Sequence, residues 1–205
     1  GTEFGQGTTG GAINLVTKKP EIGEFNATAE IDYGTYDTLR IRGSINAPLS
    51  DTLAFRGSIQ KYEHDGFSEI VGGTLDGYDL DDADSISAKA AFLWEPNEDW
   101  SILLQGFLQD SDQNAAAQKN VDDPLPDPRD LSQDFPGFFD LENYSGSVHI
   151  SWDTPWGITV KSLTGYQELK KRQGVDGDRL TEATFSQDRL GFFGFENWDV
   201  LTFWD

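Results

Sequence analysis

Hydrophobic and polar residues alternate one by one along much of this chain, the pattern of strands with one apolar and one polar face. In residues 25–33 the apolar positions are Phe25, Ala27, Ala29, Ile31 and Tyr33. Similar segments lie at about 38–47, 53–62, 86–94, 100–109, 144–152 and 158–169. Helical periodicity is almost absent. The sequence therefore predicts an all-β protein of antiparallel strands.

The connections between these segments fall into two classes. Compact turns at 48–51, 96–99 and 154–157 alternate with longer, acidic connections at 64–84, 110–142 and 171–184, and the turn at 34–37 is a short member of the second class. Up-and-down neighbours place all connections of one class at the same end of the sheet. A short-turn rim opposite a long-loop rim is typical of outer-membrane barrels and is not a regular feature of soluble sandwiches.

The polar positions leave two interpretations open. Arg40 and Arg42 share the polar side of the second segment, and two arginines in a dry β core would be costly without partners. They suit either the wet lumen of a barrel, which can also face a plug, or a solvated outer face. In the segment 100–109 the alternation is weaker, because Leu103 and Phe107 stand on polar positions.

Four tryptophans lie beside compact turns: Trp94, Trp100, Trp152 and Trp156. Ordinary packing at strand ends would explain this placement. An aromatic girdle at a bilayer interface explains it better, because tryptophan is enriched at that depth.

Charge and composition exclude several classes of protein. With 36 acidic against 15 basic residues the formal charge is −21, which disfavours nucleic acid as a partner and attracts cations. The absence of cysteine excludes disulfide scaffolds and cysteine metal sites. The chain has no apolar run of the ~20 residues that a membrane helix needs, whereas barrel strands need only about 9–11 alternating residues.

Motifs for catalysis or nucleotide binding are weak. Gly5, Gly7 and Gly10 match G-x-G-x-x-G, but a strand-like run at 12–16 follows where a dinucleotide fold needs a helix. Gly11 occupies the lysine position of a phosphate-binding loop. His64 and His149 lie in different segments without metal-site spacing, and no serine stands in a G-x-S-x-G elbow. We therefore expect neither an enzyme nor a resident cofactor.

The acidic run at 76–82 raises the possibility of a calcium site, because hard cations prefer oxygen ligands. The run lacks the residue order and the closing glutamate of an EF-hand loop. A solvated external loop is the favoured interpretation.

The segment from Gly5 to Pro20, GQGTTGGAINLVTKKP, resembles the end of the plug domain of TonB-dependent outer-membrane receptors. Tyr33-Gly34, the turn at 48–51 with Phe55-Arg56, the loop entry at 65–67 and the run at 163–166 are similar to the early barrel of that family. The resemblance implies a 22-stranded barrel closed by an N-terminal plug, which imports nutrients such as ferric siderophores, cobalamin or carbohydrates. The GTTGG variant is most similar to siderophore-type members.

On this resemblance, residues 1–20 are the C-terminal end of a plug, and residues 21–205 are the N-terminal part of the barrel, with seven or eight strands. The chain has no methionine, and we expect a fragment of a longer exported protein. The energy-coupling box of the family is expected ahead of this segment, so no coupling residue is assigned. An eighth strand begins near Phe185, and the tail from that residue receives no assignment.

The predicted function is energy-coupled nutrient uptake, with a ferric siderophore as the expected ligand, in the outer membrane of a Gram-negative bacterium. The loops at 64–84 and 110–142 are expected to meet the ligand. Expected partners are membrane lipid, the iron–siderophore ligand and the TonB protein, with no nucleic acid. The alternatives are a passive porin, which has no reason to contain residues 5–20, and a soluble acidic calcium-binding β domain for glycan or protein binding.

Overall fold

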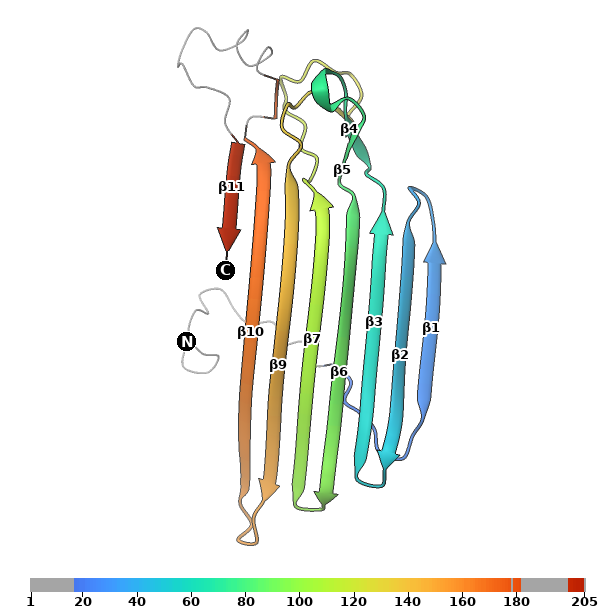
Figure 1. The fold of residues 1–205 in the computed structure, drawn as a ribbon, viewed down its shortest axis with the longest axis vertical. Coiled ribbons are helices and arrows are strands. Elements are labelled where there is room, and N and C mark those ends of the chain that lie inside the picture. Colours follow the sequence, from blue (N-terminus) through green and yellow to red (C-terminus); the bar gives the residue numbers. More distant parts are fainter. Residues whose placement is uncertain (1–16, 178, 182–198, 205) are drawn as a thin grey trace.

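The computed structural model describes residues 17–177, 179–181 and 199–204, the last range as backbone only. Its main element is a sheet of eight strands in the order β1-β2-β3-β6-β7-β9-β10-β11 (Figure 1). The strands are β1 Asn26–Tyr33, β2 Leu39–Ser50, β3 Leu53–His64, β6 Ala83–Asn97, β7 Trp100–Asn114, β9 Phe138–Asp153, β10 Thr159–Asp176 and β11 Asp199–Trp204. All neighbours are antiparallel. The predicted all-β fold is confirmed, and the open sheet is consistent with part of a barrel.

The two classes of connection lie at opposite ends of the sheet, as predicted (Figure 1). The strands, however, run further into the compact turns than the sequence indicated. Pro48 lies inside β2 and Pro96 inside β6, and each adjoins an irregularity in the strand register. Proline is tolerated where the ladder is interrupted, because its missing N–H is not needed there. The turns are therefore tighter than the ranges 48–51 and 96–99.

The long connections are not simple loops. Strands β3, β7 and β9 extend into them, and the remainder contains β4 (Ser68–Ile70), a 3₁₀ turn (Gly73–Leu75), β5 (Tyr78–Leu80) and β8 (Asp130–Leu131). We call residues 65–82 and 115–137 together the cap. Strand β4 pairs antiparallel with β5 and parallel with β8, so a second sheet joins two connections that are distant in sequence.

The cap has its own hydrophobic core. Ile70, Leu80 and Leu131 are at most 1% exposed, and Leu75, Tyr78 and Ala117 pack against them. The chain enters the cap closely, because a Cβ at Gly66 would lie 2.5 Å from the carbonyl oxygen of Leu80. The cap is thus a small folded unit at the long-loop rim.

The cross-strand register separates the main sheet into two faces. One row on the first face runs through Thr28, Ser44, Ser58, Lys89, Phe107, Ser145 and Gln167. One row on the second face runs through Ala47, Phe55, Phe92, Leu104 and Val148. We call these the polar face and the apolar face. Leu103 and Phe107 do lie on the polar face, as the alternation predicted.

Two predictions fall on residues outside the described ranges: the strand-like run at 12–16 and the start of an eighth strand near Phe185. Within the described ranges, β11 pairs with the end of β10, from Lys171 to Asp176. No helix in the described part of the chain is long and apolar enough to cross a membrane.

Candidate functional site

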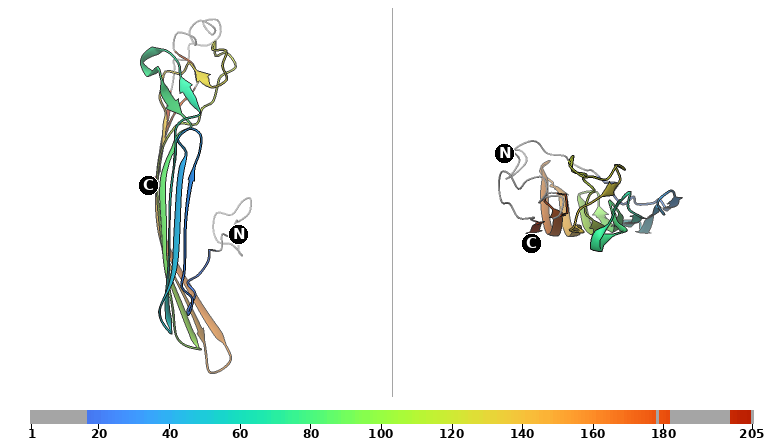
Figure 2. Two further views of the ribbon diagram at one scale, coloured as in Figure 1. Left: turned by 90° about the vertical axis from the view of Figure 1, so that its right-hand side faces the viewer. Right: turned by 90° about the horizontal axis from the view of Figure 1, so that it is seen from above.

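The polar face carries the chain's own N-terminal segment, residues 17–25. The Asn46 side chain on β2 is 1% exposed and accepts a hydrogen bond from the Glu21 N–H at 2.9 Å. Its amide also donates to the carbonyl oxygens of Glu21 and Glu24, at 2.9 and 2.6 Å. Further along the face, the Lys89 ammonium donates to the Thr17 hydroxyl. These contacts hold the segment against one side of the sheet (Figure 2).

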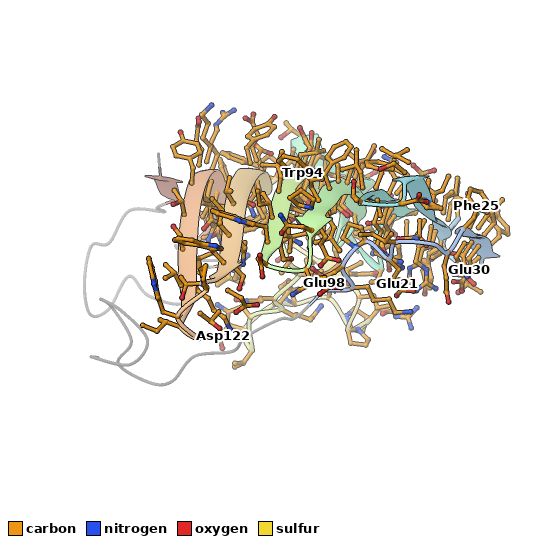
Figure 3. The ribbon with its side chains drawn as sticks, turned by 90° about the horizontal axis from the view of Figure 1, so that it is seen from below. Glu21, Phe25, Glu30, Trp94, Glu98 and Asp122 are labelled. Atoms are coloured by element: carbon orange, nitrogen blue, oxygen red, sulfur yellow. The ribbon has the colours of Figure 1, made fainter. Side chains whose placement is uncertain are left out.

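The most buried apolar side chains of the sheet also lie on the polar face. Ala54, Ala91 and Leu103, all on the polar face, are at most 5% exposed. Pro20 of the crossing segment is also fully buried. Seen end-on, Glu21 and Glu30 lie on one side of the sheet and Trp94 lies on the other (Figure 3). The crossing segment therefore covers part of the polar face, around Ala54, Ala91 and Leu103, whereas Leu163 on the same face of β10 is 69% exposed.

A hollow of about 600 Å³ lies on the polar face, and its lining includes Glu30, Arg42, Gln60 and Lys89. The Arg42 guanidinium bonds the Glu30 carboxylate at 2.7 Å and the Asp32 carboxylate at 3.2 Å. Arg42 thus shares its face with the crossing segment. This placement favours the lumen interpretation of the arginines over a solvated outer face.

The apolar face is exposed over its whole width. Ile31 is 71% exposed and Leu104 49%, although both are large aliphatic residues. Other exposed members of this face are Ile41, Ile45, Ile59, Ile86, Phe92, Trp94, Leu108, Tyr144 and Val160. Monomeric soluble proteins rarely expose so large a contiguous apolar surface. We call these residues the apolar band.

Tryptophans mark the short-turn edge of the band. Trp100 and Trp152 are cross-strand partners whose rings stack at 5.2 Å between centroids. Trp94 is 47% exposed on the same face, and Trp156 projects from the β9–β10 turn with 78% exposure. The exposed Trp94 and Trp156 agree with the predicted girdle, and the stacked Trp100 and Trp152 agree equally with packing at strand ends.

The opposite edge of the band crosses the strands obliquely. From β1 to β10, the last apolar residues are Tyr33, Leu39, Ile59, Ile86, Leu108, Tyr144 and Tyr166. The register row that starts at Tyr33 reaches Arg172 on β10, six residues beyond Tyr166. Most members of that row are charged, including Glu63 and Asp84.

This obliquity gives an angle. Averaged from β1 to β10, the edge moves by about one residue per strand, a rise of ~3.3 Å over a strand spacing of ~4.8 Å, or roughly 35° from the perpendicular to the strands. Strands in closed barrels tilt by about 35–45°. When strands tilt by this angle from the barrel axis, an edge that deviates by the same angle from the perpendicular to the strands lies at a constant height along that axis.

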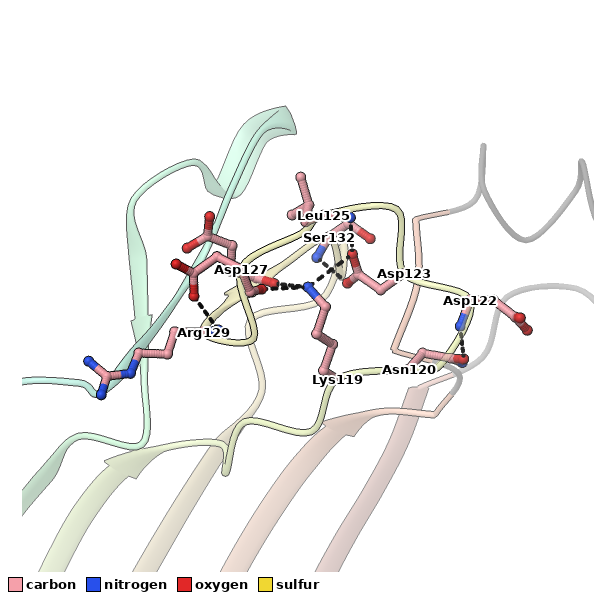
Figure 4. Close-up of polar contacts among 9 residues, drawn as sticks. Lys119, Asn120, Asp122, Asp123, Leu125, Asp127, Arg129 and Ser132 are labelled. Atoms are coloured by element: carbon pink, nitrogen blue, oxygen red, sulfur yellow. Dashed lines mark hydrogen bonds and ion pairs between the residues drawn. The ribbon is translucent and has the colours of Figure 1, made fainter.

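The cap unites the two loops that were expected to meet the ligand. Lys119 organises the second of them: its ammonium donates to the carbonyl oxygens of Asp127 and Asp130 at 2.9 and 2.5 Å (Figure 4). It also lies 3.4 Å from the fully buried Asp123 carboxylate. That carboxylate accepts the backbone N–H groups of Leu125 and Ser132, both at 2.9 Å. One lysine thus holds an acidic loop in a defined shape.

Two carboxylates of the acidic run at 76–82 accept backbone hydrogen bonds from the chain at the start of the second cap segment. Asp81 accepts the backbone N–H of Ala117 at 2.9 Å, and Asp82 accepts that of Asn114 at 2.6 Å. Burial raises the pKa of Asp82, against the lowering effect of the Asn114 hydrogen bond. Burial also raises the pKa of Tyr78. Among the described residues, no group of three or more His, Cys, Asp or Glu side chains could hold a metal ion.

The two histidines lie where the sequence placed them. His64 ends β3 at the entrance of the cap. His149 lies on the polar face, where its Nε2 is 3.2 Å from the Ser147 hydroxyl. They are in different strands and form no common site.

Sequence reasoning missed two positions, Asn46 and Lys119. Asn46 is one polar residue in a regular alternation, and nothing local distinguishes it from Ser44. Lys119 had a weak signal, because it is one of two basic residues in a connection with nine acids. A basic residue among so many acids indicates an internal ion pair.

The sequence of this chain is similar to those of curated receptor proteins. The chain is 27% identical over 191 residues to the metal-pseudopaline receptor CntO of Pseudomonas aeruginosa PAO1, and 25% identical over 191 residues to CntO of strain UCBPP-PA14. Each match covers 86% of this chain and 25% of the relative. The chain therefore spans a quarter of the length of these curated relatives. No family model matches the chain. No solved structure matches it either.

These relatives are receptors and not enzymes, which fits the expected function class. The match supports the resemblance to TonB-dependent receptors. The name of the relatives specifies a metal bound to pseudopaline and does not mention iron or a siderophore. The ferric-siderophore subtype remains a prediction from the sequence.

Proposed function

We propose that this chain forms part of the wall of a TonB-dependent outer-membrane receptor that imports a metal chelate. The observation that carries the proposal is the apolar band, exposed on one face and oblique to the strands by the tilt of a membrane barrel. Residues 1–20 are then the end of the plug, and residues 21–205 are the first part of the barrel. Membrane lipid covers the band.

The covered polar face supports the same proposal. A plugged barrel has a polar interior that is partly filled by the plug, and here the N-terminal segment is anchored at Asn46 on the polar face. The cap at the long-loop rim then faces the cell exterior and meets the ligand first. Movement of the plug, driven through the TonB protein, opens the path through the lumen.

The proposed substrate class, a metal chelate, is common to the sequence resemblance and to the name of the relatives. The sequence resemblance implies a ferric siderophore, and the relatives are named for metal-pseudopaline. Both are metal ions held by an organic chelator. The acidic cap favours a neutral or cationic complex, because like charges at the entrance slow the approach of polyanions.

The alternatives fit less well. In the part of the chain that the structure describes, no second sheet covers the apolar band, as a soluble calcium-binding β domain would require. A passive porin provides no reason for a segment fixed across its lumen at Asn46.

Uptake by intact cells tests the proposal. A strain lacking the gene that encodes this chain is complemented with it and given zinc-65 pseudopaline or an iron-55 siderophore. We expect complementation to restore accumulation of one complex, and inactivation of TonB to abolish it. Equal uptake with and without the gene, for both complexes, would refute a metal-chelate receptor. Uptake that survives loss of TonB would indicate a passive pore.

A further inference from the structure

Four rings gather where the polar face meets the cap. The His64 ring stacks on Phe67 with 4.5 Å between centroids, and it lies 5.4 Å from the Tyr62 ring. Phe67 in turn meets the edge of Tyr36 at 4.9 Å. We call Tyr36, Tyr62, His64 and Phe67 the mouth cluster. It contains the one imidazole at this rim within the described residues.

The hydrogen bonding of His64 assigns its tautomer. Nδ1 lies 2.8 Å from the carbonyl oxygen of Asp65. A carbonyl oxygen only accepts, so Nδ1 carries a hydrogen, and in the neutral imidazole Nε2 then keeps its lone pair. Within the described part of the chain, Nε2 has no hydrogen-bond partner. His64 therefore presents an unused nitrogen donor.

The position of His64 places this nitrogen on the route into the lumen. His64 and Tyr62 alternate onto the polar face of β3, and Tyr62 pairs with Arg40, whose guanidinium lies 4.6 Å from the Tyr62 ring centroid. Gln60, the next residue of β3 on this face, lines the hollow that contains Arg42. The imidazole thus lies between the cap and the hollow.

Two hydrogen bonds hold the mouth cluster in place. The Tyr36 carbonyl accepts the Asp65 N–H at 2.8 Å, which joins the β1–β2 turn to the cap entrance. The Arg129 guanidinium, from the second half of the cap, donates to the Tyr36 hydroxyl at 2.6 Å. Fixed neighbours reduce the entropy that a side chain loses when it binds a ligand. The imidazole is pre-organised for binding.

We infer that His64 Nε2 binds the metal of the imported chelate as the complex passes from the cap into the lumen. The inference rests on the proposed function and adds the residue that recognises the metal. The Nε2 lone pair forms a coordinate bond, and a water or a weak donor atom of the chelate leaves the metal. No electron is transferred. A neutral imidazole suits zinc, copper, nickel and iron.

His149 provides a matched control. It lies on the same polar face, but its partner on β10 is Leu163, nearer the short-turn rim. Its Nε2 already interacts with the Ser147 hydroxyl. Replacement of either histidine removes one imidazole from the polar face, and only His64 borders the cap.

The test uses the full-length protein in detergent and copper(II)-pseudopaline as the probe. Electron paramagnetic resonance reports nitrogen ligands of copper through superhyperfine splitting. We expect the spectrum of the complex to gain one nitrogen coupling on binding to the native protein and to His149→Ala, but not to His64→Ala. We expect the affinity of His64→Ala to fall about tenfold to a hundredfold or more, since replacing residues that merely orient metal ligands already costs this much.

Each other outcome has a defined meaning. An extra nitrogen coupling that persists in His64→Ala would overturn the inference and leave the proposed function intact. Failure of the native protein to bind copper-, zinc- or iron-loaded chelates would overturn both. Hydrogen exchange of the cap in His64→Ala checks its folding. If exchange in the cap rises, His64→Asn replaces it, because the asparagine amide nitrogen takes the place of Nδ1 and can keep the bond to Asp65 without an imidazole.

Discussion

The main sheet and the cap treat large apolar side chains in opposite ways. On the sheet Ile31 and Leu104 are largely exposed, whereas in the cap Ile70, Leu80 and Leu131 are buried against one another. Both regions belong to one chain and join at the ends of β3 and β7. The difference is the one expected if the cap lies in water and the band lies in the membrane of the proposed function. The cap buries its apolar side chains within itself, whereas the described residues provide no cover for the apolar band.

The largest expected effect comes from the cap core. Leu80→Ala removes a fully buried side chain, and such changes cost about 2–5 kcal/mol. We expect hydrogen exchange in residues 65–82 and 115–137 to rise together, because β4 joins both halves. Strands β6 and β7 should keep their protection. Exchange that rises in only one half would show that the cap is not one unit.

A charged residue on the apolar band tests whether lipid covers this face. Leu104→Arg places a cation on the apolar face, where it costs about 2–4 kcal/mol at the middle of a bilayer. We expect loss of the protein from the outer-membrane fraction. Gln105→Arg is the matched control, because its neighbouring position lies on the polar face. Equal behaviour of the two variants would contradict a lipid-covered band.

Asn46 tests the covered side of the sheet. Asn46→Ala leaves the backbone groups of Glu21 and Glu24 without their partners, at a cost of about 1–3 kcal/mol. We expect faster exchange in residues 17–25 alone. Ser44→Ala serves as the control, since the Ser44 hydroxyl bonds that of Thr28 on β1, at 2.7 Å. Unchanged hydrogen exchange in residues 17–25 of Asn46→Ala would show that Asn46 does not anchor the segment.

The smallest effect concerns pH and the cap. Because burial raises the pKa of Asp82, its folded form binds a proton more readily than its unfolded form. The cap therefore loses stability as the pH rises from the ordinary aspartate pKa through the raised one. Asp82→Asn keeps an oxygen for the Asn114 N–H, and we expect it to flatten this dependence. Hydrogen-exchange rates of the cap, corrected for the intrinsic effect of pH, measure this dependence. An equal dependence on pH in the native protein and in Asp82→Asn would show that Asp82 is not its source.

Much of the sheet was predictable, because its information is local. Alternation from Phe25 to Tyr33 requires only neighbouring residues, and it identified the strand and both of its faces. The alternating lengths of the connections identified the two rims. Strand ends were less predictable, since the alternation fades where Pro48 and Pro96 enter the ladder but the pairing continues.

The cap and the candidate site were mostly not predictable. Ile70 and Leu131 are adjacent across β4 and β8 although 61 positions separate them in the chain. A three-residue strand carries too few positions for a periodic signal. His64 was noticed in the sequence, but its stacking on Phe67 and its bond to Asp65 depend on the fold.

The sequence alone determined that apolar and polar side chains alternate along the strands and that the chain turns tightly at one rim, because these properties reside in adjacent side chains. Tertiary structure decided which face the N-terminal segment crosses, that two loops form one cap, and that the apolar band is oblique to the strands. Each of these depends on the register between strands, and register is fixed by contacts among residues far apart in the chain.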